Sequence, residues 1–119
     1  MKALLIKEPW IKLILEGKKT WEIRGTNTKT RGKFALIRSG SGLIVGTADL
    51  TGVIGPLTLD ELKRHRKKHQ APPELPEQGL PYRNTIAWVL ENAKPLKKPK
   101  PYQHLKGAVV CVGLGDIRL

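Results

Sequence analysis

The sequence predicts an α+β fold: a small β-barrel of five or six short strands with two or three flanking helices. Three observations lead to this prediction. Short apolar runs bounded by turn residues recur along the chain, which is typical of short strands. Gly46 and Gly52 fall inside the longest strand pattern and indicate bulges or a sharp bend, as a closing barrel requires. Strands and helices do not alternate regularly, which argues against a doubly wound sheet.

Length and composition are those of one folded domain spanning residues 1–119. The chain is 39% apolar and 27% charged. No apolar run approaches the roughly 18 residues of a membrane helix, and the N-terminus lacks a signal-peptide pattern, so the cytoplasm is the expected location. Cys111 is the single cysteine and lies in an apolar run, which favours an inert core thiol. His65 and His69 have helical spacing but no convincing third ligand, so no metal site and no cofactor are expected.

The charge is the most informative number. Lysine and arginine total 22 against 10 acidic residues, a net charge of +12 with a pI near 10.2. Such an excess favours a polyanionic partner, chiefly nucleic acid. A merely solvated basic surface is the alternative. An anionic membrane is a weaker one, because the sequence has no basic amphipathic helix with an aromatic face.

The first part of the chain predicts strand, helix, strand. Ala3–Ile6 is a short apolar run typical of a buried strand, and Pro9–Glu16 has helical spacing with proline in the first turn. Gly17 is expected to end this helix in the left-handed conformation. From residue 20 to residue 24 polar and apolar residues alternate, which indicates a second strand.

The middle of the chain begins with a polar loop over residues 25–32, suited to phosphate contacts or to a solvated turn. Phe34–Ile37 and the long run Leu43–Gly55 predict two further strands. Thr58 and Glu61 have capping-box spacing, so a helix is expected from there through Lys68, with its basic run facing solvent or contacting a nucleic-acid backbone.

The last part opens with a proline-rich excursion over residues 70–81. Thr85–Leu90 predicts a strand in which Trp88 belongs to the core. Glu91–Tyr102 is interpreted as an extended basic segment whose prolines keep it out of a central ladder. Gly107–Leu114 predicts a final buried strand.

Two groups of motifs then carry a family resemblance. Glu8-Pro9-Trp10 leads the first helix, and Gly17-x-Lys19-x-x-Glu22-x-Arg24 and Gly32-x-Phe34 follow. Downstream come Ile86–Asn92, Pro99-x-Pro101-Tyr102 and Gly107–Val110. Over nearly the whole chain, this pattern resembles the ASCH (activating signal cointegrator homology) family. The resemblance implies a barrel of the pseudouridine synthase and archaeosine transglycosylase (PUA) type, with a cleft beside the helix–strand junction and a role in the recognition of RNA or another single-stranded nucleic acid.

The resemblance also bears on catalysis. One branch of the family deacetylates modified cytidine with a lysine, a threonine three residues later and a glutamate from a later segment. Lys19 matches the lysine, but Glu22 stands where the threonine is needed. Glu74 and Glu77 lie in the region of the later acid, within a proline-rich segment that does not align well with the family. This departure argues against the amidohydrolase. Other members are ribonucleases, a reaction that a lysine and a carboxylate could support.

Two functions follow for the candidate site. As a non-catalytic nucleic-acid-binding module, the chain would use the following residues: Lys7, Trp10, Lys19, Glu22, Arg24, Arg38 and Tyr82. As a hydrolase acting on RNA or a modified nucleoside, it would use Lys19 and Glu22, although strand alternation puts these on opposite faces unless the turn at Gly17 intervenes. The non-functional alternative is an exposed row of ion pairs formed by Lys19, Glu22 and Arg24. Trp10 is either a core anchor or an aromatic wall of the site.

Overall fold

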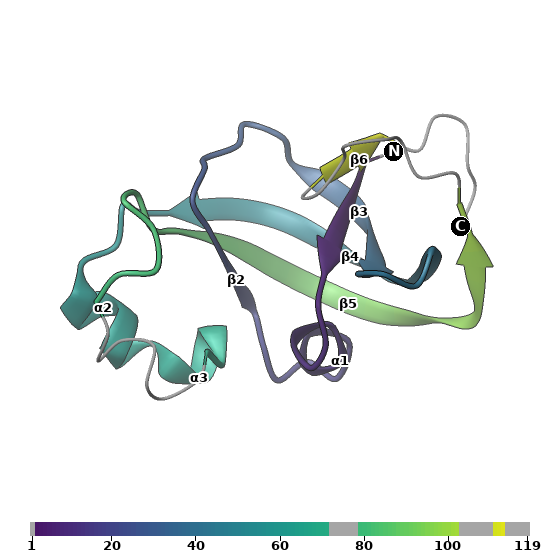
Figure 1. Cartoon of the computed structure of the whole chain (residues 1–119), viewed down its shortest axis with the longest axis horizontal. Coiled ribbons are helices and arrows are strands. Elements are labelled where there is room, and N and C mark those ends of the chain that lie inside the picture. The colour runs from purple at the N-terminus through teal and green to yellow at the C-terminus, as the bar shows by residue number, and fades with distance from the viewer. Residues whose placement is uncertain (1, 72–78, 103–110, 114–119) are drawn as a thin grey trace.

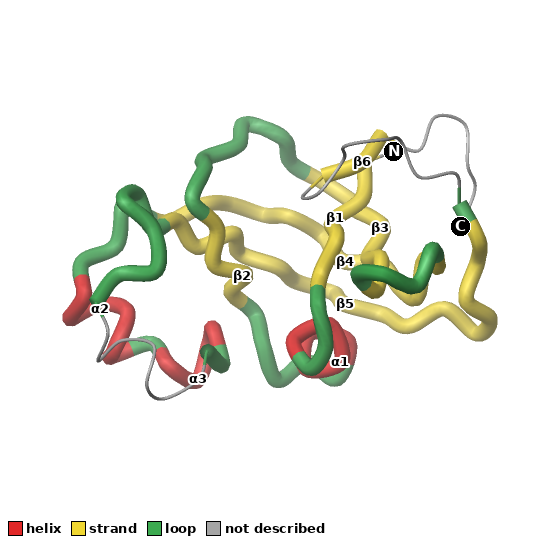
Figure 2. The backbone as a smooth tube through the Cα atoms, in the orientation of Figure 1, coloured by secondary structure: helices red, strands yellow, loops and turns green. Residues whose placement is uncertain are grey.

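A computed structural model describes residues 2–71, 79–102 and 111–113 of the chain. Its strands form one sheet in the order β2-β5-β4-β3-β1-β6 (Figures 1 and 2). The strands are β1 (Lys2–Ile6), β2 (Trp21–Arg24), β3 (Gly32–Arg38), β4 (Leu43–Ile54), β5 (Ile86–Pro101) and β6 (Cys111–Gly113). The helices are α1 (Trp10–Leu15), α2 (Leu59–Arg64) and α3 (Arg66–His69).

The sheet is mixed, because β1 and β3 run parallel while the other neighbouring strands are antiparallel. Over the described residues its order begins at β2 and ends at β6, so the sheet is an open half-barrel with three small helices beside it. This confirms the predicted α+β class, and the half-barrel is consistent with the predicted small PUA-like barrel.

The long pair β4–β5 supplies the bend of the sheet. Its register shifts between Ile44 and Gly46 and again between Leu50 and Gly52, so the bulges predicted at the two glycines are confirmed. A β-carbon on Gly46 would lie 2.6 Å from the carbonyl oxygen of Lys94 and would also meet the Leu15 side chain. The bend therefore brings β4 close to both β5 and α1.

Residues 91–102 are extended and stay out of a central ladder, as predicted, although they pair with β4 on one side. β5 continues to Pro101 and pairs with β4 as far as the Leu43–Pro101 position. Only Ile86–Val89 pairs with β2 on the other side. Beyond that point β5 is an edge strand over the described residues, and an edge position tolerates proline because one side of the backbone needs no donor.

The helix boundaries follow local signals in the sequence. Thr58 and Glu61 form both bonds of the predicted capping box at the start of α2. The expected continuous helix through Lys68 is instead broken at His65, which ends α2 and precedes α3. Thr20 N–H donates to the carbonyl of Lys68 (2.9 Å), so α3 is tied to the residue before β2.

The core lies where α1 packs into the half-barrel. Ile11 and Ile14 of α1 contact buried residues of β1, β3, β4 and β5. Trp88 belongs to this cluster as predicted, is 4% exposed, and donates from Nε1 to the carbonyl of Thr26 (2.9 Å). The strand predicted over Gly107–Leu114 is described only as β6, and the other residues of that range lie outside the described part. No helix among the described residues has the length and hydrophobicity to cross a bilayer.

Candidate functional site

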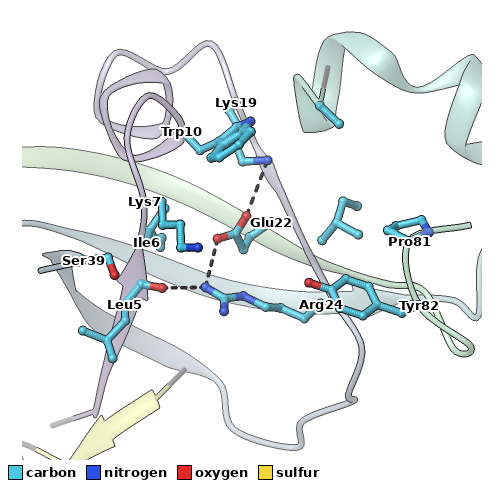
Figure 3. Close-up of a pocket in the computed structure, with 12 residues that line it drawn as sticks. Leu5, Ile6, Lys7, Trp10, Lys19, Glu22, Arg24, Ser39, Pro81 and Tyr82 are labelled. Atoms are coloured by element: carbon cyan, nitrogen blue, oxygen red, sulfur yellow. Dashed lines mark hydrogen bonds and ion pairs between the residues drawn. The ribbon is translucent and has the colours of Figure 1, made fainter. Parts of the chain in front are cut away.

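A cavity of about 290 Å³ lies between β1, the start of α1 and β2 (Figure 3). Pro81 and Tyr82 close it on the side opposite β1. The described residues that line it are Leu5, Ile6, Lys7, Trp10, Lys19, Glu22, Ile23, Arg24, Ser39, Ala71, Pro81 and Tyr82. The set includes six of the seven residues that the sequence nominated. The seventh, Arg38, forms an ion pair with Glu8 (Nε–Oε1 3.4 Å) beside the cavity, with about half of each side chain exposed.

The turn after α1 positions Lys19. Gly17 has φ +77° and donates to the carbonyl of Ile14, while Lys18 N–H donates to the carbonyl of Leu13. These two bonds make a Schellman motif, so the predicted left-handed glycine cap is confirmed. Lys19 N–H also donates to Leu13, so this residue folds back toward the helix end.

Lys19 and Glu22 therefore meet, which strand alternation alone had argued against. β2 begins only at Trp21, so the alternation of faces does not extend back to Lys19. Lys19 Nζ lies 3.5 Å from Glu22 Oε1 and donates to the backbone carbonyl of His69. Its side chain is 3% exposed. Burial lowers the pKa of Lys19 below its usual 10.5, and the Glu22 carboxylate offsets part of that shift.

Arg24 completes the polar floor of the cavity. Its Nη2 donates to Glu22 Oε2 (3.0 Å) and to the carbonyl of Leu5 (2.8 Å), which joins β2 to β1 (Figure 3). Arg24 Nε is buried and has no hydrogen-bond partner among the described residues. Lys19, Glu22 and Arg24 thus form the row of ion pairs foreseen as the non-functional alternative. The row is not exposed, since the side chains of Glu22 and Arg24 are only 11% and 14% accessible.

His69 is outside the described lining but holds Lys19 through its backbone carbonyl, and sequence reasoning missed it because it ends a run that was expected to face solvent. Its side chain is fully buried. Ala71 N–H donates to its Nδ1 (3.0 Å), so Nε2 carries the proton and donates to the carbonyl of Leu62 (2.6 Å). Burial lowers the pKa of His69 below its usual 6.5. In the continuous helix that the sequence predicts, the seven-residue spacing would put Leu62 and His69 on one face, and this was the available signal.

The aromatic residues lie on different walls. Trp10 is half-buried, packs against the main core cluster and also lines the cavity, so both interpretations of this residue apply. Tyr82 is 44% exposed at the opposite wall. Lys7 is exposed at the end of β1, and its ammonium points toward the Glu22–Arg24 pair (Figure 3).

The lining offers no metal-ligand set: in the described ranges, no three His, Cys, Asp or Glu side chains group closely enough to hold an ion. Glu74 and Glu77, the two acids considered from the sequence, lie outside the described residues, as do all side chains of β6, including Cys111. What the arrangement provides chemically is a set of cationic donors around one carboxylate, between two aromatic side chains. Such a set can bind a flat polar ligand, and its close lysine–carboxylate pair can move a proton.

Comparison with known proteins places the chain in a family. No curated protein matches it significantly in sequence. Three crystal structures of an ASCH protein from Zymomonas mobilis, two of them point mutants, share its fold. One mutant superposes with a TM-score of 0.77 at 15% identity, covering 97% of this chain and 88% of that chain. The other mutant gives 0.69 at 17% identity, with 84% and 74% covered. The remaining structure gives 0.68 at 16% identity, with 82% and 71% covered. The ASCH domain model matches residues 4–100, which is most of the sequence, and the chain therefore belongs to the ASCH domain family.

Proposed function

We propose that the chain, acting as one module over residues 1–119, binds single-stranded RNA and receives one unpaired base in the cavity described above. The observation that carries the proposal is the composition of that cavity. Trp10 and Tyr82 supply aromatic walls, and Glu22 with Arg24 supplies an acceptor and donors between them. Unpaired bases are recognised in this way, by stacking on aromatic rings and hydrogen bonds to their edges.

The size of the cavity supports a single base. Ligand pockets for drug-sized molecules are roughly 300–1,000 Å³, and this cavity of about 290 Å³ is at the lower end. A base in a duplex could not enter it without being extruded, at a cost of a few kcal/mol. Because an unpaired base avoids this cost, we expect the protein to bind single-stranded RNA in preference to a duplex.

The surface charge supports a polyanionic partner. Exposed cations lie on α2 and α3, including Lys63 and Lys67, and on the far part of β5, including Lys97 and Lys98. They add a sequence-independent, salt-sensitive attraction to phosphates.

A hydrolase acting on RNA or a modified nucleoside is the second candidate, and one observation favours it. Lys19 and Glu22 come within 3.5 Å of each other in a buried position, and the lowered pKa of Lys19 brings it closer to the range of a general acid or base. However, Lys19 also donates to the carbonyl of His69, a bond that fixes it in the wall. We therefore favour binding.

Fluorescence anisotropy with labelled single-stranded RNA and its matching duplex tests the binding proposal. We expect tighter binding to the single strand and a loss of about tenfold in Tyr82→Ala, since stacking of one base on an aromatic ring contributes about 1–3 kcal/mol. Leu80→Ala is the matched control: Leu80 is 39% exposed, two residues away, and outside the described lining. Equal affinity for both RNA forms, or equal losses in both variants, would refute the proposal.

A turnover assay separates the second candidate. The protein is incubated with single-stranded RNA or with acetylcytidine in the presence of a chelator, and products are followed by chromatography. Binding without turnover is the expected result. Turnover that disappears in a folded Lys19→Met variant would instead identify a hydrolase.

A further inference from the structure

The cavity has two chemically different ends. At one end Lys7 follows β1 and Ser39 follows β3, and the Ser39 N–H donates to the carbonyl of Ile6 (2.9 Å), which holds the two chain segments together. Both residues line the cavity. Neither the Lys7 ammonium nor the Ser39 hydroxyl has a hydrogen-bond or ion-pair partner within the described part of the chain. This end presents a cation and a hydroxyl that are available to a ligand.

The other end is flat and mostly apolar. Pro81 and Tyr82 lie across the cavity from Lys7 and Ser39 (Figure 3), and Ile23 adds an apolar side chain to the lining. The Tyr82 ring lies directly on the backbone of Gly25, where an added β-carbon would be 2.8 Å from Tyr82 Cδ1. The ring is therefore held against β2 while 44% of the residue stays accessible.

The charge of the lining is not balanced. Among the described residues of the lining, three are cations, Lys7, Lys19 and Arg24, and one is a carboxylate, Glu22. Glu22 is already shared between Lys19 and Arg24, which leaves Lys7 outside the row of ion pairs. This described set stays net positive even when Lys19 is neutral. A neutral base alone would leave this charge uncompensated, whereas a ligand with an anionic group at the Lys7 end would compensate it.

We infer that the cavity binds a whole nucleotide in one orientation, with its phosphate at Lys7 and Ser39 and its base against Tyr82 and Pro81. The inference rests on the proposed function and deepens it: the ligand unit is a nucleoside monophosphate, and the phosphate is recognised inside the site as well as by the outer surface. Arg24, whose side chain is 14% accessible, crosses the floor between the two ends, beside the place of the base or the sugar (Figure 3).

Isothermal titration of the purified full chain with UMP, AMP, uridine and adenosine tests this orientation. We expect each monophosphate to bind about tenfold more tightly than its nucleoside, the effect of one charge-assisted hydrogen bond. Lys7→Gln should remove that difference by weakening monophosphate binding and leaving nucleoside binding unchanged. Lys12→Gln is the matched control, because Lys12 is an exposed lysine of α1 outside the described lining. Tyr82→Ala should weaken nucleotides and nucleosides by the same factor.

Equal affinity for nucleosides and monophosphates, or a Lys7→Gln loss that is the same for both, would overturn the inference while leaving RNA binding intact. Inorganic phosphate binding as tightly as UMP would reduce the site to a simple anion site and would also overturn it. If neither nucleotides nor single-stranded RNA bind, the proposed function fails together with the inference. Oligouridylates bearing a 5′-phosphate, a 3′-phosphate or neither then identify the source of the phosphate: a preference for one end assigns the site to a strand terminus, and equal binding assigns it to an internal phosphate.

Discussion

The cavity wall at Lys19 and the far part of β5, from Lys94 to Pro101, are both lysine-bearing, yet the two regions are held in opposite ways. Lys19 is 3% exposed and is bound by Glu22 and by the carbonyl of His69. Lys94, Lys97 and Lys98 are exposed. Whether a lysine is structural therefore depends on the partners that the fold brings to it, and not on the charge of its own segment.

Different forces stabilise the two regions. In the cavity wall, buried charges must be matched, because each would otherwise lose its hydration without compensation. In the far part of β5, the backbone of β5 packs closely against β4. Gly46 of β4 pairs with Pro95, and the space that a β-carbon on Gly46 would need is filled by the carbonyl oxygen of Lys94 and the side chain of Leu15. One region should thus be sensitive to the removal of a charge, and the other to the addition of a methyl group.

Glu22→Gln should have the largest effect on stability. It removes the only carboxylate that faces both Lys19 and Arg24 in the described lining. Breaking a buried ion pair from one side costs about 3 kcal/mol or more, because the remaining charge stays buried. We expect a loss of about that size in the free energy of unfolding, measured in urea. Glu91→Gln, an exposed carboxylate of β5, is the control and should behave like the unsubstituted protein. Similar stability in the two variants would mean that the row of ion pairs is not structural.

Gly46→Ala should have the next largest effect and should act on the other region. Its new β-carbon would lie 2.6 Å from a backbone oxygen, which must move, and overpacking of this kind costs about 1–3 kcal/mol. Gly52→Ala provides a matched control at another bulge of β4, since nothing lies within 4 Å of a β-carbon there. Urea unfolding of the two variants measures the difference. If Gly52→Ala destabilised as much, the cost would belong to the bulge backbone and not to the packing against β5.

The sequence predicted the features that depend on near neighbours in the chain. The Schellman cap at Gly17 and the capping box at Thr58 require only residues a few positions apart, and both formed. The bulges at Gly46 and Gly52 were predicted because glycine inside a strand pattern has few other uses.

The features that were missed depend on tertiary position. The prolines of residues 91–102 exclude a central strand but allow an edge strand. The segment can pair with β4 as an edge strand because β2 is short, and its own sequence does not encode the length of β2. His69 was expected to face solvent because its neighbours in the sequence are charged. It is buried because α3 docks beside the start of β2. The residues nominated for the site were mostly brought together, but the meeting of Lys19 with Glu22 depended on where the strand begins.

His69, whose carbonyl accepts from Lys19 of the cavity wall, gives the stability of the protein a pH dependence. Its pKa is lowered in the folded protein, so between that value and 6.5 the unfolded chain binds a proton that the folded chain does not. The free energy of unfolding should therefore fall as the pH decreases below 6.5, by about 1 kcal/mol per pH unit down to the lowered pKa of His69. Above pH 6.5 the contribution of His69 should not change. Protonation of Nδ1 would also break the bond from Ala71 N–H. Lys19, Arg66 and His65, the charged or titratable neighbours, oppose the protonated form further.

Urea midpoints from pH 5 to pH 7.5 measure this dependence, and His69→Gln is the informative variant because an amide can still donate to Leu62 but does not titrate in this range. Its stability should be lower than that of the unsubstituted protein at pH 7.5 and should change less on acidification. An unchanged slope in the variant would assign the dependence to another group.

The smallest effect is expected for the double substitution Lys97→Gln and Lys98→Gln in the far part of β5. Both side chains are exposed, so the free energy of unfolding should change by less than about 0.5 kcal/mol. Binding to single-stranded RNA should weaken only at low salt, and the slope of log affinity against log salt should fall by about 0.7 for each phosphate that the variant no longer neutralises. Lys63→Gln with Lys67→Gln removes the same charge from α2 and α3, which continue through His69 to the cavity-lining Ala71. Equal salt slopes in the two double variants would mean that the RNA strand has no preferred path over the protein surface. A larger drop in the salt slope for the α2–α3 variant would place the RNA strand beside the cavity and leave the lysines of β5 as a solvated surface.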